Sequence, residues 1–241
     1  RSWKNVKHAS PGNNVLQRGA MNLDLTEEQK LIQETAREFA QAVLEPVAAD
    51  LDGGGDRTVF YANLKELAEL GFMGLNVSDA YGGSEAGVIA FSLAITEIAK
   101  SCASTAVTVS VNNMVAEVIQ SLGNDEQKNR YVSKICSGEY LAGAFALTEP
   151  GAGSDPASMS TSAILDGDHW VLNGSKIFIT SAPYAGVFVV WAVTDSEAPK
   201  GRGISVFLVE PEADGMVIGK AEEKMGQHAS STNEIHFQDC R

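Results

Sequence analysis

The sequence predicts a multi-domain α+β protein, in which an N-terminal all-α helical domain precedes a small antiparallel β-barrel domain. Up to residue 139 the apolar residues recur at helical spacing, and beyond Tyr140 they occur in short runs with a period of two. The chain has 241 residues, 44% of them apolar, enough for a substantial core in one or two domains. We therefore expect an extension or linker over 1–20, a helical domain over 21–139 and a β-barrel domain over 140–241.

The first expected helix follows a capping box, in which Thr26 is the cap and Gln29 stands three residues later. An apolar stripe then runs from Leu31 to Val47, and Pro46 should end or bend this helix. Further helices are expected over 59–70, 88–99, 104–122 and 125–136. Of these, 104–122 is rich in valine and threonine, which favour strands, but its valines keep helical spacing and predict a helix.

The second half contains short runs typical of strands. They cover 140–148, 160–172, 175–180, 186–194, 203–209 and 233–238. Asp166-Gly167 and Asn173-Gly174 are typical of hairpin turns. Strands at this spacing favour a small barrel or a sandwich over units in which strands alternate with helices.

Composition argues against several classes of partner. The net charge of −13 disfavours nucleic acid, whose binding depends on clustered lysine and arginine. The negative charge is typical of a protein whose acidic surface keeps it in solution, and the alternative is an acidic rim at which a basic protein partner docks. No run approaches the roughly 18 apolar residues of a membrane span, so a soluble protein is expected.

Cysteine and histidine positions predict neither disulfides nor a metal site. Cys102, Cys136 and Cys240 lack paired spacing, which favours reduced, buried thiols in a cytoplasm or mitochondrial matrix. The histidines lack the spacing of metal ligands, so no metal is assigned.

Residues 146–156, ALTEPGAGSDP, leave a predicted strand and enter a glycine turn. Bare backbone at Gly151 and Gly153 can approach a phosphate group. The turn lacks the third glycine of a dinucleotide fingerprint, and Gly174-Ser175-Lys176 lacks the earlier glycine of a P-loop. A plain turn therefore remains the alternative.

Thr148 and Thr180 each close a β-rich run, and the aromatic Phe178 lies near the second. Two hydroxyls at strand ends could contact the edge of a planar ring, although threonine also simply suits strand ends. Glu149 and Asp155 could be an acid–base pair. We favour a structural role, in which these acids organise the turn by accepting backbone N–H groups.

Five segments together resemble the acyl-CoA dehydrogenases. They are ELGFMGLNVSDAYGG at 69–83, GNDEQKNRYVSKICSGE at 123–139, FALTEPGAGSD at 145–155, GSKIFITSA at 174–182 and KMGQHASSTNEIHFQDCR at 224–241. Their order is that of the family, and the resemblance extends from Met21 to Arg241. The ending at 229–241 is most similar to short-chain and branched-chain members.

The resemblance implies an FAD enzyme of fatty-acid β-oxidation that converts an acyl-CoA to its trans-2-enoyl form. In the family a glutamate removes the α proton, a hydride passes from the β carbon to flavin N5, and an electron-transfer flavoprotein accepts the electrons. Members are homo-oligomers, either tetramers or dimers. The family's implied alternatives for this chain are a non-catalytic flavin- or acyl-CoA-binding module and an oxidase branch acting on acyl-CoA or nitroalkanes.

Carried onto this sequence, the resemblance implies three groups of site residues. The backbone of Phe145, Ala146, Leu147 and Thr148 and the Thr148 hydroxyl would bind the pyrimidine edge of the flavin. Gly153 and Ser154 would lie near the FAD pyrophosphate, with Ser154 also near the CoA part of the substrate. Phe178, Ile179 and Thr180 would flank the isoalloxazine, with Thr180 near N5.

Two residues depart from the family's pattern, and one domain is not expected. Many members have tryptophan where Phe178 stands and arginine where His228 stands. The family continues with a C-terminal four-helix bundle that carries the catalytic glutamate, and this chain ends at Arg241. We therefore expect the bundle to be absent, assign no catalytic residue, and expect an inactive chain with weak or no FAD binding.

Overall fold

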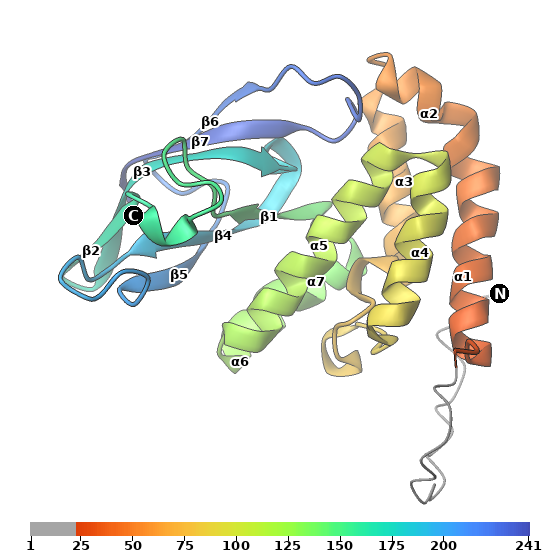
Figure 1. The fold of residues 1–241 in the computed structure, drawn as a ribbon, viewed down its shortest axis with the longest axis horizontal. Helices are drawn as coiled ribbons and strands as arrows, with labels where there is room; N and C mark the ends of the chain where they lie inside the picture. Colours follow the sequence, from red (N-terminus) through yellow and green to blue (C-terminus); the bar gives the residue numbers. More distant parts are fainter. Residues whose placement is uncertain (1–22) are drawn as a thin grey trace, which may run out of the picture.

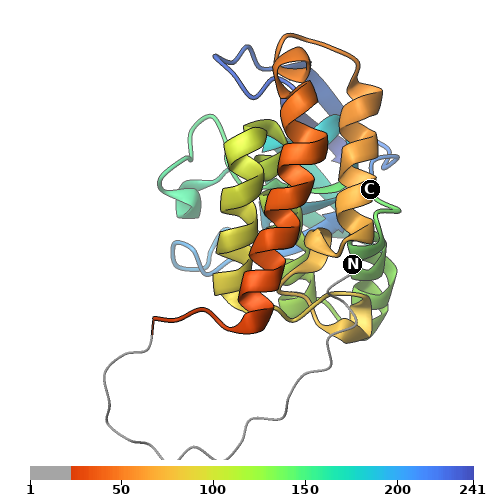
Figure 2. The ribbon, with the colours of Figure 1, turned by 90° about the vertical axis from the view of Figure 1, so that its right-hand side faces the viewer.

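The computed structural model describes residues 23–241, and the extension expected over 1–20 lies outside them. A group of helices stands on one side of the molecule and a single sheet on the other (Figure 1). The predicted order of a helical part followed by a β part is therefore confirmed. Viewed from the helical side, α1 lies in front, α3 and α4 flank it, and the strands lie behind (Figure 2).

The helices form where the apolar period predicts them. Their bounds are α1 (Glu27–Phe39), α2 (Glu45–Asp52), α3 (Arg57–Glu69), α4 (Gly87–Ser101), α5 (Ala103–Leu122), α6 (Asp125–Gln127) and α7 (Ser133–Ser137). The capping box of Thr26 and Gln29 is present, and the valine-rich segment of α5 is helical. Short 3-10 turns cover Phe72–Gly74, Asp79–Tyr81, Pro156–Ser158 and Ala182–Tyr184, and π-helical turns cover Ala40–Leu44 and Lys128–Val132.

Pro46 does not end the first helix, contrary to one of the two expected outcomes. The chain passes through the π-helical turn Ala40–Leu44 and continues as α2. Pro46 then lies in the first turn of α2. A missing N–H is tolerated at that position because the first N–H groups of a helix have no partner within it.

Seven strands of the described residues form one sheet in the order β1-β4-β2-β3-β7-β6, with β5 paired to β4. Their bounds are β1 (Ala142–Ala146), β2 (Ser162–Asp166), β3 (His169–Thr180), β4 (Ala185–Val193), β5 (Ile204–Val209), β6 (Met216–Ala221) and β7 (Thr232–Cys240). The sheet is not closed, and β1 runs parallel to β4. The expected antiparallel barrel is wrong in these two respects.

The sheet stays open because, among residues 23–241, β5 pairs only with β4 and β6 only with β7, which leaves the outer edges of both strands unpaired. Strand β1 contacts helix α5. The Asn112 side chain of α5 accepts a hydrogen bond of 2.7 Å from the backbone N–H of Gly143 in β1. A Cβ on Gly143 would lie 2.5 Å from the Val115 side chain, so only glycine lets α5 come this close. Helix α5 thus packs closely against β1 at Gly143.

Only one of the two predicted hairpin turns exists. Asp166-Gly167 joins β2 to β3, and Asp166 pairs with His169. At Asn173-Gly174 the chain instead continues as β3, with a register shift against β7. Gly174 has a φ of +147°, and a Cβ there would lie 2.5 Å from the Thr161 hydroxyl. This glycine therefore serves a strand irregularity and a close approach, and does not form a turn.

A hydrophobic cluster joins the two parts of the molecule. Val115 and Ile119 of α5 are buried together with Val187 and Val189 of β4. A larger cluster fills the helical part, and another lies on the sheet between β3, β4 and β7. The helices therefore hold the sheet through buried apolar side chains, which fixes the position of the strand ends relative to α5. Among the described residues, no helix is both long and apolar enough to cross a bilayer.

A buried carboxylate, Glu97 of α4, stabilises the helical part. It lies 2.9 Å from the Lys100 amine and accepts hydrogen bonds from Gln33 and Arg37 of α1. Burial alone would raise its pKa, but the hydrogen bonds from Arg37, Lys100 and Gln33 outweigh burial and lower the pKa of Glu97 from 4.5 to about 2.

We expect Glu97 to make the protein sensitive to acid. Since its pKa is depressed in the folded state, its contribution to stability is present above pH 4.5 and is lost as the pH falls toward 2. Urea unfolding of the wild type and of Glu97→Gln should differ most near neutral pH and converge at low pH. A difference that does not change with pH would contradict this role.

Candidate functional site

The structure brings the two predicted strand ends together. The backbone N–H of Ile177 in β3 donates to the carbonyl oxygen of Thr148, at 2.9 Å, just beyond the end of β1. The Lys176 amine donates to the carbonyl oxygen of Leu147, at 3.1 Å. The segments 145–148 and 178–180, far apart in sequence, therefore form one contiguous edge.

The hydroxyl groups at this edge are free to bind something else. Within residues 23–241, neither the Thr148 nor the Thr180 side chain has a hydrogen-bond partner, and both residues are half-buried. Nearby, the Ser181 hydroxyl is fully buried and also has no partner in the described part of the chain. Buried polar groups without partners are rare in folded proteins, so this edge has unused hydrogen-bonding capacity.

The backbone of residues 178–181 is strained. Phe178 has a φ of +58° and Ser181 a φ of +67°, values that residues other than glycine seldom adopt. The Phe178 ring is nonetheless 60% exposed. Strain of this kind clusters at binding and catalytic sites, because the surrounding structure must hold it. Spacing and composition give no signal for this strain.

The glycine turn leaves open space beside the same edge. A Cβ added to Gly151 or Gly153 would have no heavy atom within 4 Å, and neither residue has a positive φ. The turn's own packing therefore does not require glycine at these positions. Ser154 is exposed next to them. An anionic group could approach this backbone closely, as a phosphate of a bound nucleotide would.

Glu149 fixes the start of the glycine turn through side-chain and backbone hydrogen bonds. It is 3% exposed and lies 2.8 Å from the amine of Lys176, which is fully buried. It also accepts backbone N–H groups of Ser160 at 2.6 Å and Thr161 at 2.9 Å. Its own backbone exchanges two hydrogen bonds with Ala152. These contacts agree with the structural role that the sequence analysis favoured for Glu149.

The ionisation of this pair follows from the same contacts. Burial would raise the pKa of Glu149, but hydrogen bonds from Lys176, Thr161 and Ser160 prevail and lower the pKa to about 2. Burial lowers the pKa of the Lys176 amine, and the hydrogen bond that this amine donates to Glu149 opposes that effect. Glu149 is therefore a poor proton acceptor near neutral pH. Asp155, by contrast, is an exposed partner of Ser158 and Lys200.

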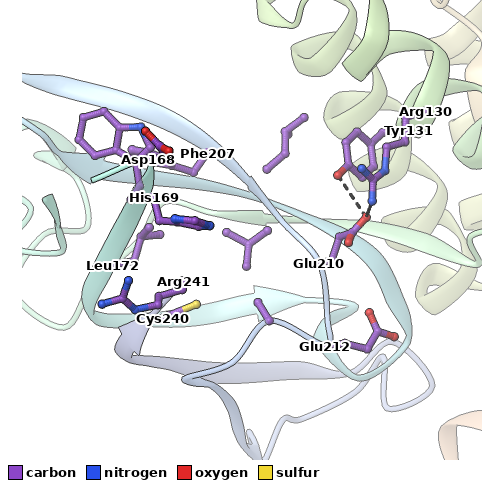
Figure 3. A pocket seen from close by; sticks show the side chains of 14 residues that line it. Arg130, Tyr131, Asp168, His169, Leu172, Phe207, Glu210, Glu212, Cys240 and Arg241 are labelled. Atoms are coloured by element: carbon purple, nitrogen blue, oxygen red, sulfur yellow. Dashed lines mark hydrogen bonds and ion pairs between the residues drawn. The ribbon is translucent and has the colours of Figure 1, made fainter. Parts of the chain in front are cut away.

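A cavity of the described residues lies elsewhere, and sequence analysis did not point to it. It has a volume of about 460 Å³ and lies between the π-helical turn after α6 and the outer strands. Figure 3 shows an ion pair between Arg130 and Glu210 on one side, and His169 and Arg241 on the other. None of the predicted site residues lines it. No group of three metal-ligating side chains occurs among residues 23–241.

Comparison with known proteins gives the family. The acyl-CoA dehydrogenase N-terminal domain matches residues 26–139, and the acyl-CoA dehydrogenase middle domain matches residues 144–240. A short-chain specific acyl-CoA dehydrogenase of Clostridium acetobutylicum is 41% identical over 221 residues, covering 91% of this chain and 57% of that protein.

Solved structures agree. Butyryl-CoA dehydrogenase from Megasphaera elsdenii superimposes with a TM-score of 0.83 and 36% identity, over 91% of this chain and 58% of that one. An acyl-CoA dehydrogenase from Bacillus anthracis in complex with FAD superimposes with a TM-score of 0.80 and 33% identity, over 90% of this chain and 36% of that one. This chain thus spans little more than half the length of the curated relative it matches. It belongs to the acyl-CoA dehydrogenase family, with a helical N-terminal domain and a β-sheet middle domain.

Proposed function

We propose that this chain is the flavin-binding portion of an FAD-dependent acyl-CoA dehydrogenase, which oxidises acyl-CoA to trans-2-enoyl-CoA. One observation carries the proposal: the edge formed by 145–148 and 178–180 has free hydroxyls, an exposed aromatic ring and open backbone beside it. The family membership of the chain and the FAD complex of its Bacillus anthracis relative support the choice of flavin.

The residues present fit the chemical groups of FAD. The Thr148 hydroxyl and the backbone of 145–148 offer donors and acceptors to the polar edge of a flat ring. The Phe178 ring offers an apolar face, and Thr180 a second hydroxyl. The open turn at Gly153 and Ser154 suits the pyrophosphate, and Ser154 also the CoA part of the substrate.

FAD, when bound, supplies the hydride acceptor for the β carbon of the substrate. The chain's own residues hold and orient the partners of that reaction. Glu149 takes no part in proton removal, since its low pKa and its contact with Lys176 keep it an ionised structural group. We assign no catalytic base among the described residues.

The partners proposed for the whole protein follow from the family. The substrate would be an acyl-CoA. The likeness to the short-chain enzyme of Clostridium acetobutylicum favours a short or branched acyl group. An electron-transfer flavoprotein would accept the electrons, and the protein would be a homo-oligomer. Anaerobic addition of butyryl-CoA to the flavin-loaded whole protein tests the reaction, because substrate oxidation bleaches the flavin absorbance.

Thr180→Val tests the proposed flavin edge. The change keeps the shape of the side chain and removes its hydroxyl, so we expect FAD affinity to fall about tenfold, the value of roughly one hydrogen bond. Flavin fluorescence quenching, titrated to excess FAD, measures the affinity. Thr96→Val on the exposed face of α4 is the matched control and should leave it unchanged. The titration is made on the whole protein, because weak or no FAD binding is expected of this chain alone. Equal affinity of the wild type and Thr180→Val would remove Thr180 from the site.

A further inference from the structure

The loop between β6 and β7 crosses from the sheet to the helical part. In Figure 1 it extends from the end of β6 toward α2. Arg57 of α3 donates to the carbonyl oxygens of His228 and Ala229, at 2.8 and 2.9 Å. The backbone N–H of His228 donates to the carboxylate of Asp52, at the end of α2, at 2.8 Å. Residues 222–231, here called the β6–β7 loop, are thus attached to two helices.

The imidazole of His228 has an acceptor on each side. Its Nδ1 lies 2.7 Å from the carbonyl oxygen of Asp52, and its Nε2 lies 2.7 Å from the carbonyl oxygen of Lys224. A carbonyl oxygen can only accept, and a neutral imidazole has only one N–H. Only the imidazolium form can donate to both oxygens, since in the neutral ring a nitrogen lone pair would face a carbonyl oxygen.

The surrounding charges are of both signs. The Asp52 carboxylate lies 3.5 Å from Nδ1 and favours the protonated ring. Lys224 opposes it, although its amine is engaged by carbonyl oxygens of Gln227 and Ser230. Arg57 faces the backbone of the loop, not the ring. The hydrogen bonds to the carbonyls of Lys224 and Asp52 raise the pKa of His228, and they prevail over burial and over the charge of Lys224.

We propose that His228 is a pH-sensitive latch, whose imidazolium holds the β6–β7 loop on the C-terminal end of α2 and whose deprotonation loosens that attachment. The proposal rests on the two carbonyl contacts and is independent of the flavin. Since the pKa of His228 is raised in the folded state, its contribution to stability is fully present below 6.5 and is lost as the pH rises through the folded value.

The latch lies close to the strand end described above. The loop leads directly into β7, whose first residue Thr232 pairs with Thr180. Within the loop, the carbonyl oxygen of Ser231 accepts from the backbone N–H of Ser181, at 2.8 Å. The Ser230 hydroxyl accepts from Thr108 of α5. When the loop loosens, we therefore expect the strained segment 178–181 to loosen before the rest of the sheet.

An NMR titration of the protein tests the latch. The ring carbon signal of His228, assigned by its loss in His228→Gln, should titrate above the ordinary histidine pKa. Backbone amide signals of residues 226–230 should titrate with the same midpoint, because the ring and the loop respond to one proton. A His228 pKa at or below the ordinary value, or loop amides that do not follow it, would overturn the proposal.

Two variants distinguish the effect of the His228 charge from a general effect of changing this side chain on folding. His228→Arg keeps a permanent cation with several donors, so its urea midpoint should not decline between slightly acidic and slightly alkaline pH as the wild type's does. His228→Gln should lower the midpoint at acidic pH and approach the wild type at alkaline pH. His169→Gln, at the exposed start of β3, is the control. Equal pH dependence of the wild type and His228→Gln would also overturn the latch. If His228→Gln does not fold, His228→Arg also lacks the imidazole and assigns the ring signal, so the wild-type titration and His228→Arg still decide.

Discussion

Replacing Lys176 by methionine is expected to lower the free energy of unfolding by about 3–5 kcal/mol, the cost typical of a broken buried ion pair. The Lys176 side chain is fully buried and its amine lies 2.8 Å from the Glu149 carboxylate. Methionine fills much of the same space but supplies no charge and no donor. Glu149 would then be a buried carboxylate that keeps only the donors from Ser160 and Thr161. Urea unfolding at neutral pH measures the loss.

A double variant distinguishes the buried charge from lost packing. Lys176→Met with Glu149→Gln removes both charges, so it should recover a large part of the stability lost in Lys176→Met. Lys220→Met, which breaks the exposed pair with Glu223, is the control and should change stability by less than about 1 kcal/mol. A loss of similar size for Lys220→Met and Lys176→Met would mean that burial of the pair is unimportant.

The same pair predicts acid sensitivity at the glycine turn. Because the pKa of Glu149 is lowered from 4.5 to about 2, the contribution of its charge is complete above pH 4.5 and is lost as the pH falls toward 2. The turn of residues 149–155 should therefore loosen in acid. If that turn binds the FAD phosphates, affinity for FAD should fall over the same range.

Features of the site that depend on residues adjacent in sequence could be predicted, whereas contacts between distant segments could not. Thr148 and Thr180 close runs of β-formers, so each strand end could be recognised by itself. Their adjacency depends on the pairing of strands far apart in sequence and was implied only by the family resemblance. Lys176 was considered only as part of an incomplete phosphate motif. Its partner Glu149 is 27 residues away, and no local pattern connects them.

The fold shows the same limit. Apolar periodicity predicted the helices and most strands because it reports which face of an element is buried. It cannot report whether the sheet closes, because closure depends on whether the outer edges of β5 and β6 pair, and these strands are far from each other in the strand order. At Asn173-Gly174 a turn signal was overridden by the pairing of β3 with β7. Strand β6 was missed because its residues are partly exposed on both faces and show little alternation.

Asn113 of α5 supports the second large prediction. It is fully buried, and its side-chain oxygen accepts the backbone N–H of Leu75 at 2.7 Å. Its amide donates to the carbonyl oxygens of Phe72 and Val109, at 2.8 and 2.9 Å. The Asn113 side chain therefore supplies hydrogen bonds to backbone groups of the buried turn after α3, in place of the partners that a regular helix or strand would give them.

Asn113→Ala is expected to lower the free energy of unfolding by roughly 2–4 kcal/mol, since the buried N–H of Leu75 and the carbonyl of Phe72 lose their partner and each costs about 1–3 kcal/mol when unsatisfied. Asn129→Ala, on an exposed helical turn, is the matched control and should cost little. Urea unfolding measures both, and hydrogen exchange at Leu75 locates the effect. If Leu75 remains protected in Asn113→Ala, water or a shifted backbone group has replaced the asparagine. In that case the contact of α5 with the segment after α3 would depend on apolar packing and on the hydrogen bonds of Glu117 to Asn76 and of Gln120 to Ser78, at 2.7 Å each.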